Sequence, residues 1–352
     1  MKELIAQAKT GGKADITVTV TKTGDAGRIE ACLLIGSVND IVKSGLTLTV
    51  KTAAATIRLD GKTLSGITNG AADSETVRIA AEIVSGGNEP VFDLSVTAGE
   101  TAVRSFGGTV TVTLPYTAPA DADPDLLTVY YRGEDGSAAE MKDAKYDAAA
   151  KTIRFTTDHF SRFFISEWIS PFGDIAKGDW YYKNVRYAYA GGLMGGTAAD
   201  TFAPDAKLSR AMLVTILWRQ EGSPEARGAA FSDVKPGQWY TGAAAWAGAN
   251  GIAAGYGDGS FGVNDDITRE QLATLLYNYA KWKNPNTAGG ANLAGFSDAD
   301  GISSWALDAM QWANTNGLVT GRTATALVPG GDANRAEAAA ILQRFLENTA
   351  KA

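Results

Sequence analysis

The sequence predicts two parts: an all-β, sandwich-like module over residues 1–166, followed by an all-α bundle of three tandem copies of one motif. Three observations predict this fold. The first half alternates polar and β-branched residues, all eight tryptophans lie beyond residue 167, and a pattern running from phenylalanine to arginine occurs three times in the second half. A chain of 352 residues, 45% apolar and 20% charged, has the composition of folded globular domains and can close more than one core.

The first half contains short period-two segments that are typical of half-buried antiparallel strands. These segments are residues 16–20, 46–50, 56–59, 76–84, 91–96, 109–114, 127–131, 152–156 and 160–165. Glycines in 132–136 favour a hairpin loop there, because glycine adopts positive φ without strain. One helix is expected at 38–43, with Ser37 as its N-terminal cap. The module is therefore predicted to be a β-sandwich with a single helical interruption.

A linker is predicted at residues 167–171, and three repeats follow it at 172–230, 231–295 and 296–352. Each repeat begins with a Phe-x-Asp motif whose acidic residues are Asp174, Asp233 and Asp298. A tryptophan follows 8, 8 and 9 positions after the phenylalanine: Trp180, Trp239 and Trp305. An arginine follows at 38, 38 and 39: Arg210, Arg269 and Arg335. This agreement in spacing identifies three copies of one structural unit.

Each copy is predicted to contain two helices. The first begins near the tryptophan, and in copy two its buried stripe is Trp239, Ala243, Trp246 and Ala247. The second follows one of three residues whose side chains accept hydrogen bonds from free backbone N–H groups: Ser209, Thr268 and Asn334. Copies two and three have the spacing of a reciprocal capping box. Neither helix can bury its apolar stripe alone, so the copies are expected to pack on one another.

The arginine of each copy takes the first position of the second helix, where the helix dipole disfavours a cation by about 0.3–1 kcal/mol. Two explanations are open and compatible. The arginine pairs with the aspartate of a Phe-x-Asp motif and braces a loop, or it forms an anion site together with the free N–H groups of the helix.

The motifs of copy two, Gly-Tyr-Gly-Asp-Gly-Ser-Phe at 255–261 and Ile-Thr-Arg-Glu at 267–270, complete a pattern that resembles three S-layer homology repeats over 172–352. The resemblance implies non-covalent anchoring of a surface protein to peptidoglycan-linked secondary cell-wall polysaccharide. It also implies a pseudo-threefold arrangement with grooves between neighbouring copies. The ligand it implies is an acidic glycan, often capped by a pyruvate ketal on an N-acetylmannosamine-type sugar.

The glycan-binding candidates are the repeated residues of this pattern. They are Arg210, Arg269, Arg335, Asp174, Asp233, Asp298, Trp180, Trp239, Trp305, Gly195, Gly255, Tyr256 and Gly321. The three tryptophans suit a platform for the C–H faces of sugars, but their helical spacing favours a place in the core. Met212, Gln271 and Leu327 depart from the family pattern, so three equivalent grooves are not expected. Copy two, around Gly255, Tyr256 and Arg269, is the most intact.

Composition argues against several other classes of function. A net charge of −7 disfavours non-specific nucleic-acid binding, and no segment reaches the ~18–20 apolar residues of a membrane span. One histidine and one cysteine leave no set for a zinc site, a disulfide or Cys–His catalysis, so neither a catalytic residue nor a cofactor is expected. The acidic residues near 258–266 lack the spacing of a calcium loop, so no metal is expected. Asp158 and His159, as neighbours on a strand, should face opposite ways.

The leading hypothesis is an extracellular anchor of the cell wall or S-layer and not an enzyme. The β module weakly resembles modules that precede such repeats in bacterial surface proteins. Residues 1–10 show no leader peptide, and we expect the chain to be the last piece of a larger secreted protein. The alternative is a self-assembling S-layer subunit whose β module makes lateral or adhesive contacts with other S-layer subunits. An enzyme acting on wall glycan through a carboxylate pair is the least favoured hypothesis.

Overall fold

The computed structural model describes residues 1–21, 28–84, 90–133, 135–225, 231–287, 289–290 and 292–351. The chain forms two compact units, Met1–Ile169 and Ser170–Ala352. The first unit extends beyond the predicted boundary at residue 166. Trp168 is only 2% exposed, its backbone N–H donates to the carbonyl of Leu126 at 2.7 Å, and its indole N–H donates to Glu140 at 3.2 Å. The chain therefore leaves the β unit only after this indole is buried.

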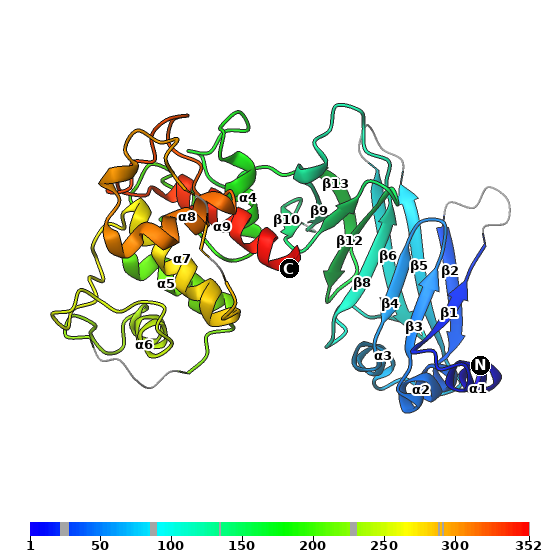
Figure 1. Cartoon of the computed structure of the whole chain (residues 1–352). Helices are drawn as coiled ribbons and strands as arrows, with labels where there is room; N and C mark the ends of the chain where they lie inside the picture. The colour runs from blue at the N-terminus through cyan, green and yellow to red at the C-terminus, as the bar shows by residue number, and fades with distance from the viewer. Residues whose placement is uncertain are drawn as a thin grey trace. The chain divides into compact units, whose positions relative to one another are not determined.

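The first unit consists of two β-sheets (Figure 1). One sheet has the order β1 (Asp15–Thr19), β3 (Thr47–Lys51), β4 (Thr56–Leu59), β8 (Val110–Pro115), β12 (Thr152–Thr157) and β11 (Lys145–Asp147). The other has the order β10 (Ala138–Met141), β9 (Leu127–Arg132), β13 (Arg162–Glu167), β6 (Val91–Ala98), β5 (Thr76–Val84) and β2 (Arg28–Leu34), with β7 (Thr101–Ala102) beside β6. Alternate residues of both sheets enter one apolar core, which includes Phe92, Phe155 and Phe163. The predicted sandwich-like class is confirmed, but β1 and β3 pair in parallel and not in the expected antiparallel sense.

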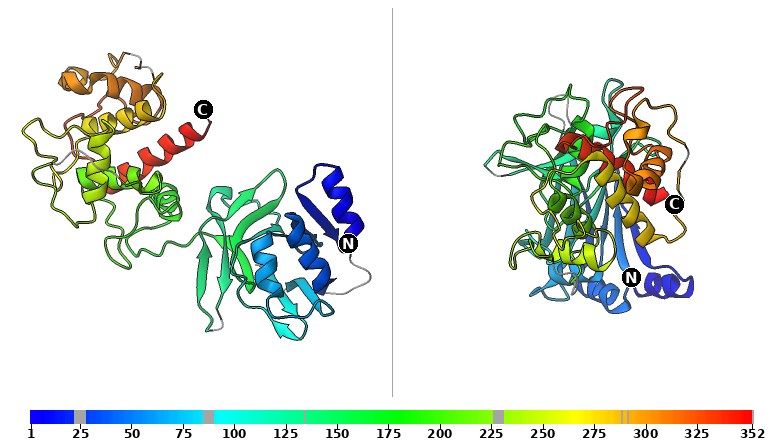
Figure 2. Two further views of the ribbon diagram at one scale, coloured as in Figure 1. Left: turned by 90° about the horizontal axis from the view of Figure 1, so that it is seen from below. Right: turned by 60° about the vertical axis from the view of Figure 1, so that its left-hand side comes forward.

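Three α-helices lie at one end of the strands, where a single helix was predicted (Figures 1 and 2). They are α1 (Lys2–Thr10), α2 (Ile35–Ser44) and α3 (Gly61–Thr68), and a short 3₁₀ turn, η1 (Pro124–Leu126), precedes β9. The Ser37 cap is wrong, because α2 begins at Ile35 after Leu34, which caps it with no side-chain hydrogen bond. The first N–H groups of α2 bond instead to the carbonyls of Glu75 and Asp73, at 2.9 and 3.0 Å.

The hairpin predicted at 132–136 joins β9 to β10. The N–H of Gly133 donates to the carbonyl of Ser137 at 2.8 Å, and Gly136 has a φ of 83°. Residue 134 lies outside the described residues. The described part of the loop thus has the geometry that its glycines predict.

The second unit has two helices in each copy. They are α4 (Tyr182–Ala190) and α5 (Arg210–Gln220), α6 (Thr241–Ala249) and α7 (Arg269–Lys283), and α8 (Leu307–Thr315) and α9 (Arg335–Lys351). Two 3₁₀ turns, η2 (Ala299–Gly301) and η3 (Ser304–Ala306), precede α8, and η2 lies where copy three has its extra residue. The first helix of each copy packs on the second helix of another copy: α6 on α5, α8 on α7 and α4 on α9. The expectation that the copies bury their stripes against one another is confirmed.

The three copies close into a ring through their backbones just before the second helices. Ile267 donates its N–H to the carbonyl of Leu208 at 2.8 Å, Ala333 to that of Ile267 at 2.8 Å, and Leu208 to that of Ala333 at 3.0 Å. Beside this triangle Lys207 bridges Asp266 at 2.9 Å and Asp332 at 2.7 Å, so one cation links all three copies. These contacts confirm the predicted pseudo-threefold arrangement.

Candidate functional site

The second helix of each copy begins with the predicted cap. Ser209 accepts the N–H of Met212 at 3.2 Å. Thr268 with Gln271, and Asn334 with Glu337, form reciprocal capping boxes. The capped backbone N–H groups are already hydrogen-bonded and so are not free to bind an anion. The caps also fix each repeat arginine at the first position of its helix.

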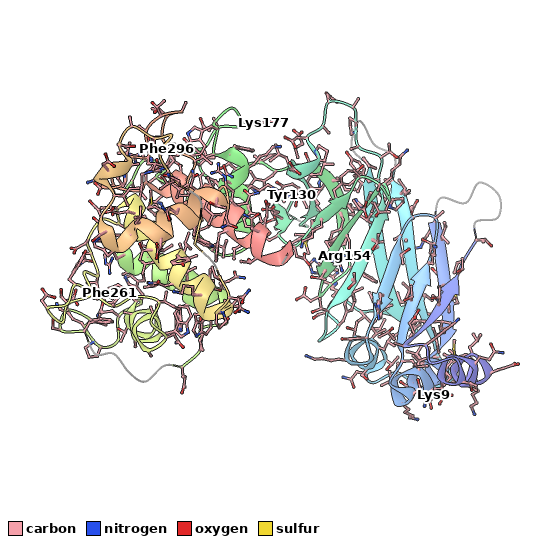
Figure 3. All side chains as sticks on the ribbon, in the orientation of Figure 1. Lys9, Tyr130, Arg154, Lys177, Phe261 and Phe296 are labelled. Carbon is pink, nitrogen blue, oxygen red and sulfur yellow. The ribbon has the colours of Figure 1, made fainter. Side chains whose placement is uncertain are left out.

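The repeat arginines hold the long loop of another copy. Arg210, Arg269 and Arg335 are only 5%, 4% and 7% exposed. Their Nε groups donate to three equivalent loop carbonyls: Phe261 at 3.0 Å, Leu327 at 2.8 Å and Phe202 at 2.9 Å. Phe261 and its loop precede α7 (Figure 3). Each arginine therefore reaches from its own copy to the next one around the ring.

The repeat aspartates hold the same loop residues from the other side. Asp233 accepts the N–H of Phe261 at 2.7 Å, and the equivalent aspartates accept those of two further loop residues: Asp174 from Phe202 at 2.8 Å, and Asp298 from Leu327 at 2.9 Å. The predicted bracing of a loop by arginine and aspartate is thus found, but the two side chains meet through one loop residue and not by pairing directly. This contact explains why a cation is retained at the positive end of a helix.

Asp298 should give the helical unit a measurable dependence on acid. Hydrogen bonds from Leu327 and Val328 lower its pKa. Because the folded pKa lies below the unfolded value of about 3.9, the stabilisation is present above that pH and is lost as pH falls through the folded pKa. We expect Asp298→Asn to lower Tm at pH 7, with the difference from the unmodified chain shrinking towards pH 3. Tryptophan-monitored melts measure this; an Asp298→Asn deficit that does not change with pH, or an equal deficit in the exposed control Asp300→Asn, would contradict it.

The rest of each guanidinium has different surroundings. Arg269 bonds to Glu337 at 3.3 Å, Arg335 donates to the carbonyl of Gly195 at 2.6 Å, and Arg210 lies 4.8 Å from the centre of the Tyr256 ring. Burial lowers the pKa of all three arginines from their ordinary value. The three copies are therefore not chemically equivalent at this position.

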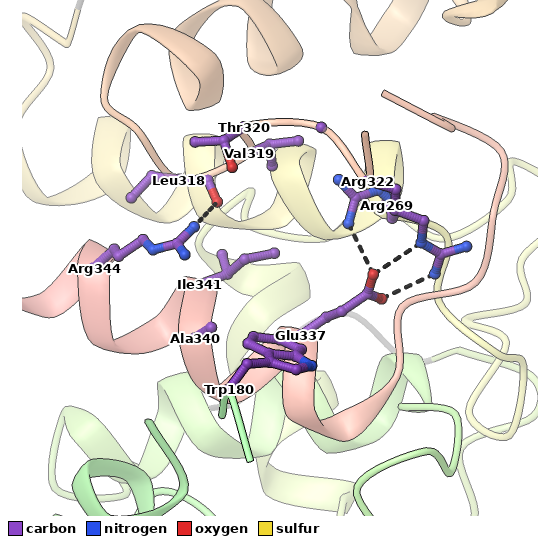
Figure 4. A pocket seen from close by; sticks show the side chains of 11 residues that line it. Trp180, Arg269, Leu318, Val319, Thr320, Arg322, Glu337, Ala340, Ile341 and Arg344 are labelled. Carbon is purple, nitrogen blue, oxygen red and sulfur yellow. Dashed lines mark hydrogen bonds and ion pairs between the residues drawn. The ribbon is translucent and has the colours of Figure 1, made fainter. Parts of the chain in front are cut away.

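Two grooves on the helical unit each combine residues of three copies, and their volumes of about 280 and 410 Å³ suit a sugar residue. The Arg269 groove is lined by Trp180, Arg269, residues 318–322, Glu337, Ala340, Ile341 and Arg344 (Figure 4). The Arg210 groove is lined by Arg210, residues 252–256, Gln271, Thr274, Leu275, Asn278 and Trp305. In each, an arginine of one copy meets the glycine loop of the next and the tryptophan of the third.

The tryptophan of each motif is exposed, so the expectation that these rings belong to the core is wrong. Trp180, Trp239 and Trp305 are 64%, 51% and 56% exposed. The first helices begin two residues after the tryptophan, which places the ring outside the helical stripe. Trp246 and Trp312, within the helices, are buried as predicted. Trp180 and Trp305 line the two grooves, whereas Trp239 lines neither.

The residues proposed together in copy two belong to different grooves. Gly255 and Tyr256 lie in the groove of Arg210, whereas Arg269 lies in the groove that contains Gly321. Each repeat arginine contacts the loop of the next copy around the ring, so the loop of copy two lies beside the arginine of copy one. The grooves thus lie between copies, as the resemblance implies, and the intact motifs of copy two contribute to two of them.

Two charged residues of the Arg269 groove, Arg322 and Arg344, lie outside the repeated motif. Arg322 donates to both carboxylate oxygens of Glu337, at 2.8 and 2.9 Å, and Arg344 lies on α9 with one guanidinium N–H 3.4 Å from the carbonyl of Leu318. Figure 4 shows the Glu337 carboxylate between Arg322 and Arg269. An alignment of the copies gives a signal for both, because Arg322 takes the position of Tyr256 and Arg344 that of Asn278.

His159 and Asp158 are in contact, contrary to expectation. Their side chains approach to 2.9 Å, because both residues follow the end of β12 and escape the alternation of a strand. Asp158 is largely exposed, with 75% of its side chain accessible. In the described parts of the chain no three His, Cys, Asp or Glu side chains gather as a metal site would need, and no helix has the length and apolarity to cross a membrane.

Comparison with known proteins identifies the helical unit. The S-layer homology domain model matches residues 171–211, 230–273 and 295–339, so the chain carries three S-layer homology domains. Such domains imply that a surface protein is anchored to the cell wall, and they place this one in the cell envelope.

Curated relatives include bacterial surface proteins. The chain is 27% identical over 215 residues to the surface-layer 125 kDa protein of Lysinibacillus sphaericus, covering 60% of this chain and 18% of that protein. It is 26% identical over 160 residues to cell surface glycoprotein 1 of Acetivibrio thermocellus, covering 43% and 7%. It is 29% identical over 252 residues to an amylopullulanase of Thermoanaerobacterium thermosulfurigenes, covering 70% and 13%. The chain thus spans less than a fifth of each relative.

Proposed function

We propose that the helical unit binds an acidic secondary cell-wall polysaccharide, with a pyruvylated sugar residue seated in the Arg269 groove. The observation that carries this proposal is the charge of that groove. Arg269 and Arg322 both bond to Glu337, and Arg344 lines the same groove, so three positive charges against one negative among the lining residues leave two in excess. Guanidinium groups bind carboxylates through strong, directional hydrogen bonds.

The groove also provides an apolar surface for the sugar ring. The exposed indole of Trp180 lies at the same groove as the arginines. An aromatic face packs against the C–H groups of a sugar, while the arginines select its acidic substituent. A pyruvate ketal combines these two features in one residue, which is why it fits the groove better than an unmodified sugar.

We also propose that this segment anchors and does not catalyse. Cys32 on β2 contacts Glu30 at 3.3 Å, and His159 contacts Asp158, so the two side chains have different partners. The β unit then acts as a spacer, or as an adhesive module, between the wall and the remainder of a longer surface protein. The amylopullulanase relative is compatible with a catalytic domain in such a remainder.

The test compares two forms of one polysaccharide. Peptidoglycan-linked wall polysaccharide is prepared untreated and after mild acid has removed its pyruvate groups, and the full chain is sedimented with each. We expect affinity to fall by about tenfold or more after treatment, and binding to the untreated form to weaken with salt. Equal sedimentation with the two forms would contradict an acidic ligand while leaving wall attachment intact.

A further inference from the structure

The Arg210 groove differs from the Arg269 groove at every aligned charged position except that of the repeat arginine itself. Tyr256 replaces Arg322 after the loop glycine, Gln271 replaces Glu337 at the third position of the second helix, and Asn278 replaces Arg344 further along that helix. Uncharged side chains thus replace two arginines and one glutamate. Arg210 is the remaining charge among the residues that line this groove.

The charge of Arg210 is already engaged within the protein. Its Nε is bonded to the carbonyl of Phe261, and its guanidinium lies 4.8 Å from the ring centre of Tyr256 and 5.3 Å from that of Phe261. The Tyr256 hydroxyl is in turn hydrogen-bonded to Asp265, whose negative charge offsets that of the arginine. A carboxylate entering this groove would find the Arg210 guanidinium packed against the rings of Tyr256 and Phe261, and it would be repelled by the nearby Asp265.

What the Arg210 groove presents is aromatic surface and amides. Tyr256 and Trp305 are 47% and 56% exposed, so both rings are available to an incoming ligand. Gln271 and Asn278 add amide groups. The Gln271 oxygen accepts the N–H of Thr268 at 3.2 Å and the Asn278 amide donates to the carbonyl of Ile252 at 3.2 Å, and their other donor and acceptor positions suit hydroxyl and acetamido groups without requiring charge. Aromatic rings with neighbouring amides suit an uncharged sugar.

We propose that the Arg210 groove binds an uncharged, N-acetylated sugar residue of the polysaccharide whose acidic residue occupies the Arg269 groove. This inference rests on the proposed function for the identity of the polysaccharide. With two different grooves, the helical unit would bind two kinds of sugar residue in one glycan. Simultaneous engagement of both would raise affinity above that of either groove alone.

The test uses two probes that differ by one acidic group: the methyl glycoside of N-acetylmannosamine and its pyruvate ketal. Indole N–H signals of the ¹⁵N-labelled full chain report each groove, with Trp180→Phe and Trp305→Phe providing the assignments. We expect the neutral probe to move the Trp305 signal with a Kd at least about tenfold below that of the ketal at the same signal. The ketal should move the Trp180 signal. In Tyr256→Arg, the ketal should gain a response at Trp305.

Each outcome separates the two proposals. A ketal that moves Trp305 as strongly as Trp180 in the unmodified chain overturns the inference and leaves the proposed function standing. A neutral probe that fails to move Trp305 also overturns the inference. A ketal that moves neither indole overturns the acidic ligand, whereas a neutral response at Trp305 in that same experiment still supports an uncharged site.

Discussion

Replacing Arg335 by methionine is expected to lower the free energy of unfolding of the helical unit by about 2–4 kcal/mol. Its guanidinium donates to the carbonyl of Phe202 at 2.9 Å and to that of Gly195 at 2.6 Å, and it lies 4.6 Å from the Phe202 ring centre. These contacts join copy three to copy one and close the ring. Methionine fills part of the space but leaves two carbonyls without their charged donor.

Urea unfolding followed by tryptophan fluorescence measures this loss, because seven of the eight tryptophans lie beyond residue 169, in the helical unit. Arg219→Met is the control: it removes the same charge from an exposed position near the end of α5. We expect this control to change stability by less than about 0.5 kcal/mol. Equal effects of the two substitutions would show that Arg335 contributes only as a surface charge.

The sequence was sufficient for features that depend on near neighbours. The capping boxes of Thr268 and Asn334 span three residues, and both are present at the starts of α7 and α9. The alternation of the β segments likewise predicted the two sheets. Local hydrogen bonds and side-chain periodicity determine these elements, so their pattern is visible in the chain.

Contacts between distant residues were not predictable in the same way. Arg335 and Phe202 are 133 positions apart, and motif spacing gives no indication that each arginine belongs with the loop of another copy. For the same reason, Gly255 and Tyr256 of copy two fall in one groove and Arg269 of the same copy falls in another. The exposed tryptophans were expected in the core because helical spacing was applied to them, whereas the first helices begin two residues later and leave these rings outside the buried stripe.

The helices of the β unit show a third kind of difference. Asp60 caps α3 by accepting the N–H of Thr63 at 2.7 Å, a signal that was present in the sequence but lay among β-rich segments. The start of α2 had no such signal, because backbone carbonyls of a distant segment satisfy its first N–H groups. Tertiary partners can replace a cap, so the absence of a capping residue does not locate a helix end.

Reversing the charge of Arg344 is expected to weaken binding of the acidic polysaccharide by about 10- to 100-fold at low salt, and by less as salt rises. The side chain is exposed on α9 and lines the Arg269 groove, so Arg344→Glu lowers the excess positive charge there from two to zero. Its hydrogen bond to Leu318 is long, at 3.4 Å, so the fold depends little on it.

The matched control is Lys281→Glu, which makes the same change in net charge at an exposed position of α7 outside both grooves. Sedimentation with untreated wall polysaccharide should be strongly reduced for Arg344→Glu and within about twofold of the unmodified chain for Lys281→Glu. With polysaccharide stripped of pyruvate, the two variants should bind alike, because Arg344 then has no acidic partner. If both variants lose binding to the untreated polysaccharide equally, affinity depends on the net charge of the protein, and the acidic sugar does not bind in the Arg269 groove.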